Sequence, residues 1–166
     1  MSKIYTRDSL LAERARWKTD GKKVVFTNGC YDILHPGHVR LLEAARTLGE
    51  ILVLGLNTDT SVRQMKGDSR PFFDQDARGY LALQLEAVDA AIFFEEATPR
   101  ELIAALLPDV LVKGADWDHF VAGREEVEAA GGEVHLIPLE AGFSSTNIAA
   151  EAMKRRTRNE AATLQL

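Results

Sequence analysis

Residues 27–38, with the sequence TNGCYDILHPGH, join an apolar segment to a helix-like segment through a turn. A strand that runs into a helix points the helix's unpaired N–H groups and its positive dipole end at the connecting loop. His35 and His38 stand at that end. Pro36 suits the first helical turn, and Gly37 lets a ligand approach the backbone. The junction therefore predicts a phosphate-binding site beyond the end of the strand.

Short apolar runs alternate with amphipathic segments along the chain, which is the pattern of parallel α/β sheets. Strands are predicted at residues 23–28, 51–57, 90–94, 109–113 and 133–138. Helices are predicted at residues 9–17, 36–48, 58–64, 75–85, 99–107, 124–130 and 146–156. The alternation predicts an α/β fold with a single domain and a Rossmann-like, doubly wound parallel sheet of about five strands.

Polar clusters directly follow four of the predicted strands. They lie at residues 28–38, 57–59, 113–117 and 142–147. Because the carboxyl ends of parallel strands meet at one edge of a sheet, we expect these clusters to converge on a single site. The doubly wound order also predicts that the strands at residues 23–28 and 109–113 are neighbours, where the strand order reverses.

Composition narrows the possible partners and compartment. The chain has 166 residues, of which 46% are hydrophobic, and a formal net charge of −5. The acidic balance argues against nucleic acid as a main partner, so any phosphate binding is expected to be local. The N-terminal residues lack the apolar core of a signal peptide, and no segment is long enough to span a bilayer. We therefore expect a cytoplasmic protein with no membrane partner, which agrees with the single cysteine, Cys30.

The turn resembles a motif of nucleotidyltransferases that join a nucleoside monophosphate to a phosphorylated small molecule, the cytidylyltransferase-like family. That motif is Gly-x-aromatic-Asp-x-x-His-x-Gly-His, and it is matched by Gly29, Tyr31, Asp32, His35, Gly37 and His38. The first histidine is typical of the branch that acts on sugar, glycerol and choline phosphates. Residues 66–71 (KGDSRP) and 107–117 (LPDVLVKGADW) are similar to segments of bacterial heptose 1-phosphate adenylyltransferases. The likeness extends from residue 10 to residue 154.

Two positions depart from the pattern of that branch. Ala115 stands where glycine is usual, and Phe72-Phe73-Asp74 replaces an aliphatic-Asn-Pro stretch. Both departures lie near the implied acceptor pocket, so the identity and anomer of the sugar stay open, as does the nucleotide base. We expect the chain to comprise an N-terminal helical extension (1–22), a nucleotidyltransferase domain (23–156) and a C-terminal tail (157–166).

The resemblance implies a role for each site residue. His35, His38 and Lys66 are the implied catalytic residues, which stabilise charge on the triphosphate. The implied nucleotide-binding residues are Thr27, Asn28, Gly29, Cys30, Tyr31, Gly37, His38, Ser144, Ser145 and Thr146. The implied acceptor-binding residues are Asp32, Asn57, Arg70, Lys113, Gly114, Asp116 and Trp117. For Asp32, orientation of the loop is favoured over a water-mediated contact with a metal ion. Mg²⁺ is the expected cofactor, held mainly by phosphate oxygens and water rather than by protein ligands.

The implied reaction transfers AMP from ATP to a heptose 1-phosphate, giving ADP-heptose and pyrophosphate for lipopolysaccharide or a related glycan precursor. ATP and heptose 1-phosphate are thus the expected partners, a homodimer is the default assembly, and a sugar kinase step is expected from a separate protein. One alternative is a cytidylyl- or guanylyltransferase for another sugar or glycerol phosphate, and another is a non-catalytic nucleotide sensor. A nicotinamide-dependent dehydrogenase and a P-loop kinase are disfavoured, because the sequence has neither glycine-rich motif.

Overall fold

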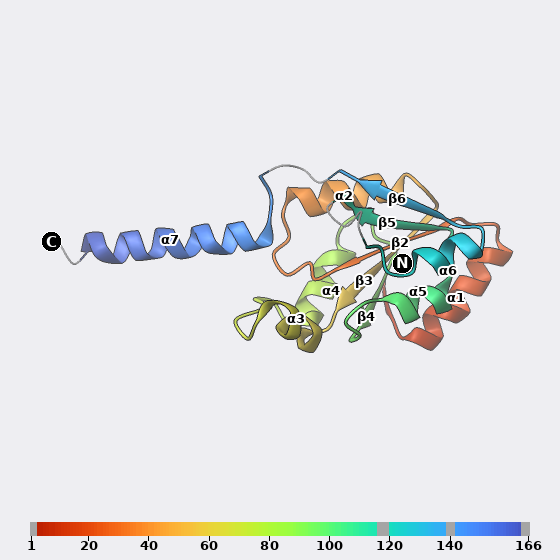
Figure 1. Ribbon diagram of the computed structural model, residues 1–166, viewed down its shortest axis with the longest axis horizontal. Coiled ribbons are helices and arrows are strands. Elements are labelled where there is room, and N and C mark those ends of the chain that lie inside the picture. Colours follow the sequence, from red (N-terminus) through yellow and green to blue (C-terminus); the bar gives the residue numbers. More distant parts are fainter. Residues whose placement is uncertain (1–2, 116–119, 139–141, 164–166) are drawn as a thin grey trace.

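The computed structural model describes residues 3–115, 120–138 and 142–163 (Figure 1). Within these ranges, six strands form one sheet in the order β1-β4-β3-β2-β5-β6, and every neighbouring pair is parallel. The strands are β1 (Lys3–Tyr5), β2 (Val24–Gly29), β3 (Ile51–Asn57), β4 (Ala90–Phe94), β5 (Val110–Gly114) and β6 (Glu133–Ile137). The predicted doubly wound parallel fold is confirmed, with one strand more than the sequence suggested.

Helices connect the strands and cover both faces of the sheet. They are α1 (Arg7–Thr19), α2 (Pro36–Arg46), α3 (Asp59–Lys66), α4 (Gln75–Leu83), α5 (Arg100–Leu106), α6 (Arg124–Ala129) and α7 (Ser145–Thr163). Buried side chains of α1, α5 and α6 belong to one core cluster, and those of α2 and α4 belong to a second. Each cluster also contains strand residues, so the two helical layers sandwich the sheet.

Alternation along β2 shows how one strand serves both cores. Val24 and Phe26 belong to the cluster of α1, α5 and α6, whereas Val25 belongs to the cluster of α2 and α4. All three side chains are fully buried. Successive side chains of a strand point to opposite faces, so a strand covered on both sides is apolar at every position. This is why the run from Val24 to Phe26 has no polar alternation.

The N-terminal residues complete the sheet. Strand β1 pairs with β4 at the edge, with Lys3 opposite Ala90, and the sequence analysis did not predict this strand. Thr6 caps α1 through a reciprocal capping box with Ser9. Leu10 of α1 is fully buried in the core. Structurally, this segment therefore contributes both an edge strand and core packing to the fold.

Strands β2 and β5 are neighbours, as the doubly wound order predicts. Val25 lies opposite Val110, and the strand order reverses between these two strands. On the other side of β2, Asn28 lies opposite Gly55 of β3. A Cβ atom at Gly55 would lie 2.7 Å from the ring of Phe26 and 3.0 Å from Cβ of Asn28. Glycine at this position therefore allows β2 and β3 to pack closely just below the polar end of β2.

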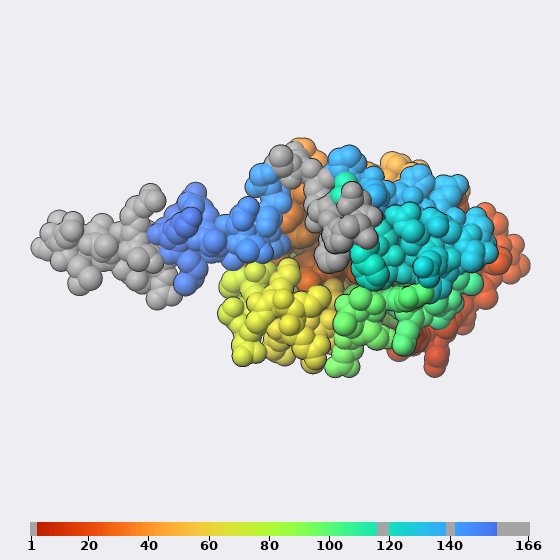
Figure 2. Space-filling model, viewed as in Figure 1, coloured from red at the N-terminus to blue at the C-terminus, as the bar shows by residue number. Residues whose placement is uncertain are grey.

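Helix α7 projects away from the sheet and its covering helices (Figures 1 and 2). It continues to Thr163, beyond the end at residue 156 that the sequence suggested. Its first residue is attached to the body of the protein, because the hydroxyl of Ser145 donates to the carbonyl of Ile33 over 3.2 Å. Across the described ranges, no helix combines the length and the apolar character needed to cross a bilayer.

Candidate active site

A cavity of about 450 Å³ opens at the edge of the sheet where the carboxyl ends of β2, β3 and β5 meet. The sequence-predicted residues that line it are Thr27, Asn28, Gly29, Cys30, Tyr31, His35, Gly37, His38, Asn57, Lys66, Lys113, Gly114, Ser144, Ser145 and Thr146. Asp32 and Arg70 are not among its lining residues. Asp116 and Trp117 lie outside the described residues. The strand ends thus bring most of the predicted groups to one place.

Other lining residues were not identified from the sequence. They are Leu41, Met65, Phe94, Ala97, Thr98, Pro99, Phe120, Ala122 and Phe143. Most of them are apolar or small, so their residue types do not distinguish them from core residues. Thr98 and Pro99 follow the carboxyl end of β4, and the rule that ligands bind beyond strand ends could have indicated them.

His35 and His38 form a stacked pair at the start of α2. His35 is the N-cap residue, and its Nδ1 accepts a hydrogen bond from the backbone N–H of His38 over 3.3 Å. The two rings stack with centroids 3.7 Å apart. When His35 is neutral, accepting at Nδ1 leaves its proton on Nε2, which can donate to a ligand. The helix start thus supplies imidazole donors as well as its own N–H groups.

Both histidines are held in the neutral state at physiological pH. The pKa of His38 is lowered to about 4, mainly by burial and also by the neighbouring His35 and Lys66. Burial also lowers the pKa of His35 from its ordinary value. A neutral imidazole can still donate one hydrogen bond, so His38 can stabilise a developing negative charge without itself being a cation.

The ring of Tyr31 packs against His38, one member of the histidine pair. Its ring is buried and lies with its centroid 4.7 Å from that of His38. Its backbone adopts a left-handed conformation with φ of 48°, which is uncommon for a bulky residue. A Cβ atom at Gly29 would lie 3.0 Å from the Tyr31 ring, so the glycine makes room for it. The unfavourable backbone conformation of Tyr31 thus places its ring against the imidazole of His38.

Two lysines give the cavity its charge. Lys66 ends α3 and Lys113 lies in β5, on different walls. Nζ of Lys113 donates to Oδ1 of Asn28 across the β2–β5 junction, over 2.5 Å. Among the described lining residues there is no carboxylate. Together with the N-termini of α2 and α7, the lysines make a cationic cavity in a chain whose formal net charge is −5.

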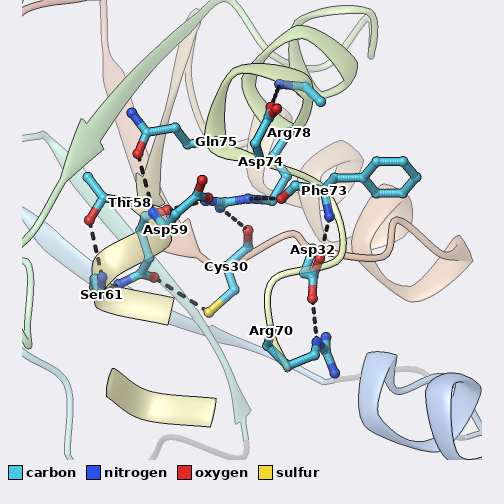
Figure 3. A network of polar contacts seen from close by, with 12 residues as sticks. Cys30, Asp32, Thr58, Asp59, Ser61, Arg70, Phe73, Asp74, Gln75 and Arg78 are labelled. Carbon is cyan, nitrogen blue, oxygen red and sulfur yellow. Dashed lines mark hydrogen bonds and ion pairs between the residues drawn. The ribbon is translucent and has the colours of Figure 1, made fainter. Parts of the chain in front are cut away.

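Asp32 faces the loop at residues 67–74 instead of the cavity (Figure 3). Its Oδ2 accepts from Nε of Arg70 over 2.5 Å. Its Oδ1 accepts from the backbone N–H groups of Phe72 and Phe73, over 2.6 Å and 3.2 Å. Both Asp32 and Arg70 are buried. In this structure Asp32 therefore holds the loop that follows Lys66.

Cys30 lines the cavity as a neutral thiol. Its Sγ donates to Oδ1 of Asn57 over 3.8 Å, and Nδ2 of Asn57 donates to the hydroxyl of Ser61 over 3.0 Å. Burial raises the pKa of the Cys30 thiol, with opposing effects from nearby cations. A raised pKa keeps the sulfur protonated and weakly nucleophilic. The arrangement is that of a wall residue that orients the amide of Asn57.

We predict that the neutral state of His38 makes the folded protein less stable in mild acid. Between pH 6.5 and about 4 the unfolded chain binds a proton at this residue and the folded chain does not. The free energy of unfolding should therefore fall as pH drops through this window, by at most about 1.4 kcal/mol per pH unit from this residue. Urea denaturation of the wild type and His38→Asn at several pH values measures it. Parallel pH profiles for the two proteins would contradict the assignment.

Residues 26–151 match the cytidylyltransferase-like family. The chain is 50% identical over 157 residues to the bifunctional protein HldE of Trichlorobacter lovleyi, covering 94% of this chain and 32% of that relative. The chain therefore spans about a third of the length of the curated relatives it matches.

Two solved structures resemble the fold. The lipopolysaccharide core biosynthesis protein of Thermoplasma volcanium matches with a TM-score of 0.59 and 28% identity, over 72% of this chain and 98% of that one. The pantoate-beta-alanine ligase of Francisella tularensis matches with a TM-score of 0.67 and 13% identity, over 90% of this chain and 73% of that one. The second likeness shows a shared fold alone.

Proposed function

Because this chain belongs to the cytidylyltransferase-like family of nucleotidyltransferases, we propose that it transfers AMP from ATP to a heptose 1-phosphate. The products would be ADP-heptose and pyrophosphate, for lipopolysaccharide or a related glycan. The likeness to a bifunctional HldE protein and to a lipopolysaccharide core biosynthesis protein supports this choice of pathway. The resemblance of residues 66–71 and 107–117 to heptose 1-phosphate enzymes supports the choice of acceptor.

The observation that carries the proposal is the charge of the cavity wall. Two lysines, two histidine side chains and two helix N-termini surround it, and no carboxylate lines it among the described residues. The reaction must bring a triphosphate and a sugar phosphate together although both are anions. A wall of cations and N–H donors offsets their repulsion. The apolar and small residues at positions 94, 97, 99, 120 and 122 offer a less polar surface for a base or a sugar.

The chemistry needs alignment more than it needs an acid or a base. An oxygen of the sugar phosphate, already ionised at neutral pH, attacks the α-phosphorus of ATP. A new P–O bond forms as the bond from the α-phosphorus to the bridging oxygen breaks, and that oxygen leaves with pyrophosphate. His38 and His35 donate hydrogen bonds to the phosphate oxygens on which charge develops, while Lys66 neutralises the polyphosphate.

The donors present fit a Mg²⁺ ion bound mainly through the substrate. Among the described residues, no group of three histidine, cysteine or acidic side chains is placed to hold a metal. The carboxylate of Asp32 is engaged by Arg70 and by backbone N–H groups. Phosphate oxygens and water would therefore make up most of the ion's coordination shell. When bound, the ion neutralises phosphate charge and orients the leaving group.

A matrix of nucleoside triphosphates and acceptors tests the reaction. We expect Mg²⁺-dependent pyrophosphate release with ATP and a heptose 1-phosphate, and much less with hexose 1-phosphates or glycerol phosphate. Preference for CTP or GTP, or for another acceptor, would replace the proposed substrates but keep the transferase. ATP binding without pyrophosphate release in any pair would favour a non-catalytic nucleotide sensor.

Replacing His38 by asparagine should lower kcat far more than it weakens ATP binding. A donor aimed at transition-state charge contributes most where that charge develops, so a loss of roughly a hundredfold is expected. His135→Asn is the matched control, because His135 lies in β6 and does not line the cavity. Steady-state kinetics and calorimetric ATP titration measure the two effects. A folded His38→Asn protein with kcat near the wild-type value would remove this histidine from the mechanism.

Replacing Lys113 by alanine should raise KM for the sugar phosphate several-fold. This corresponds to a loss of binding free energy on the order of 1 kcal/mol or more. Lys113 approaches the cavity from β5, across the β2 end from the wall that carries Lys66. ATP affinity measured without acceptor should change little. Lys23→Ala, which removes a partly exposed lysine outside the cavity, serves as control. Loss of ATP binding with an intact acceptor KM would instead assign Lys113 to the nucleotide.

A further inference from the structure

Arg78, on α4, carries a guanidinium group that is completely shielded from solvent. It donates to four acceptors, which lie at residue 30, at residues 57–59 and at residue 73; Figure 3 shows this network. These are the carbonyl oxygens of Cys30 (2.7 Å), Asn57 (2.8 Å) and Phe73 (3.1 Å), and Oδ1 of Asp59 (2.8 Å). Arg78 does not line the cavity, so any effect it has on a ligand must act through these partners.

Each partner belongs to a segment that shapes the cavity. Cys30 lies between the end of β2 and the histidine pair, and Asn57 ends β3. Asp59 begins α3, the helix that ends at Lys66. Phe73 lies in the loop at residues 67–74 that follows Lys66. One planar side chain therefore fixes the mutual positions of the segment before the histidines and the segments on both sides of Lys66.

The peptide of Phe73 is held from both sides. Its N–H donates to Oδ1 of Asp32, and its carbonyl accepts from Nε of Arg78. Asp32 itself follows the turn residue Tyr31 and also holds Arg70 of the same loop. The loop is thus connected to the histidine turn through Asp32 and to the core of the sheet through Arg78 (Figure 3).

Lysine could not replace this arrangement. A guanidinium offers five donors in a rigid plane, whereas an ammonium is a point charge on a flexible stem. With lysine, at least some of the buried carbonyl groups would lose their partner, and each such loss costs about 1–3 kcal/mol. A buried ion pair is in general weak evidence for stability, since apolar residues of similar volume often serve as well. The number and direction of these bonds instead suggest a geometric function.

We propose that Arg78 is a positioning residue of the nucleotidyl transfer, which fixes the loop at residues 67–74 and Lys66 relative to His35 and His38. This inference rests on the proposed function for its kinetic consequence. None of the four Arg78 hydrogen bonds reaches α2 or α7, so contacts of ATP with the N–H groups at the starts of these helices should depend little on Arg78. The alignment of Lys66 with the histidines does, and misplacement by about 1 Å can reduce a rate up to a hundredfold.

The chain offers a closely matched control in Arg14 of α1. Arg14 is also buried, and its guanidinium donates to the carbonyls of Leu106 and Leu107 and to the carboxylate of Asp109. It therefore binds the same kinds of acceptor as Arg78. None of these residues lines the cavity. Arg14→Lys should reproduce the general cost of disturbing a buried arginine without disturbing the site.

The kinetic test compares Arg78→Lys with Arg14→Lys well below both melting temperatures. We expect Arg78→Lys to lower kcat at least about tenfold while KM for ATP changes less than about threefold. Arg14→Lys should lower the melting temperature comparably but keep kcat within about twofold of the wild type. An unchanged kcat in Arg78→Lys, or an equal loss in Arg14→Lys, would overturn the proposal.

Hydrogen–deuterium exchange of the free protein gives a second readout that needs no turnover. Amides at residues 67–74 should exchange faster in Arg78→Lys than in Arg14→Lys or the wild type, by about fivefold or more. Unchanged exchange in this segment would refute the coupling.

Should Arg78→Lys fail to fold, Asp59→Asn replaces it in the test, with Asp109→Asn as its control. We expect residues 67–74 to exchange faster in Asp59→Asn than in Asp109→Asn, and equal exchange in the two variants would refute the coupling. A wild type without turnover would refute the proposed function, while the exchange still decides whether Arg78 holds the loop.

Discussion

Parallel pairing of β2 with β3 and β5 brings three strand ends to one edge of the sheet, and residues at or after each of these ends line the cavity. The same register places Lys113 within hydrogen-bonding distance of Asn28. It requires close approach of β2 and β3 at Gly55, where an added methyl group would press on the Phe26 ring and on Asn28. Because protein interiors are close-packed, a methyl group added at Gly55 would displace Asn28, the polar residue at the end of β2.

Two kinds of group in the cavity can interact with phosphates, charged lysines and a neutral histidine. Lys66 and Lys113 supply full charge, which attracts phosphates although the whole chain is acidic. His38 is kept neutral mainly by burial and also by the neighbouring His35 and Lys66, so it adds a directed hydrogen bond and no further positive charge. A donor of this kind is poised before the substrate arrives and needs little reorganisation as charge moves. The cost of the arrangement is an imidazole that resists protonation in mild acid.

The strand-to-helix turn and the convergence of polar clusters could be predicted because they follow from local chemistry and one topological rule. The apolar run before Asn28 and the proline at position 36 are visible in the sequence. Strand β1 could not be predicted in this way, because three residues with one exposed lysine become a strand only by pairing with β4. The position of Arg78 after residues 66–71 fits the family resemblance, but its role could not be predicted from the sequence. A single arginine in an amphipathic helix has the sequence pattern of a solvated surface residue. Its acceptors include the carbonyl of Cys30, which is distant in sequence, so only the folded structure brings the two together.

The turn itself shows why the motif residues must be adjacent. With Tyr31 in a left-handed conformation, three consecutive residues serve three different parts of the site. The carbonyl of Cys30 accepts from Arg78, the ring of Tyr31 lies under His38, and the carboxylate of Asp32 holds the loop after Lys66. Such a conformation costs on the order of 1–3 kcal/mol and persists only when its surroundings determine it fully. Here the burial of Tyr31 and the hydrogen bonds of its two neighbours supply that constraint, so the strain and the placement of the histidine have the same structural cause.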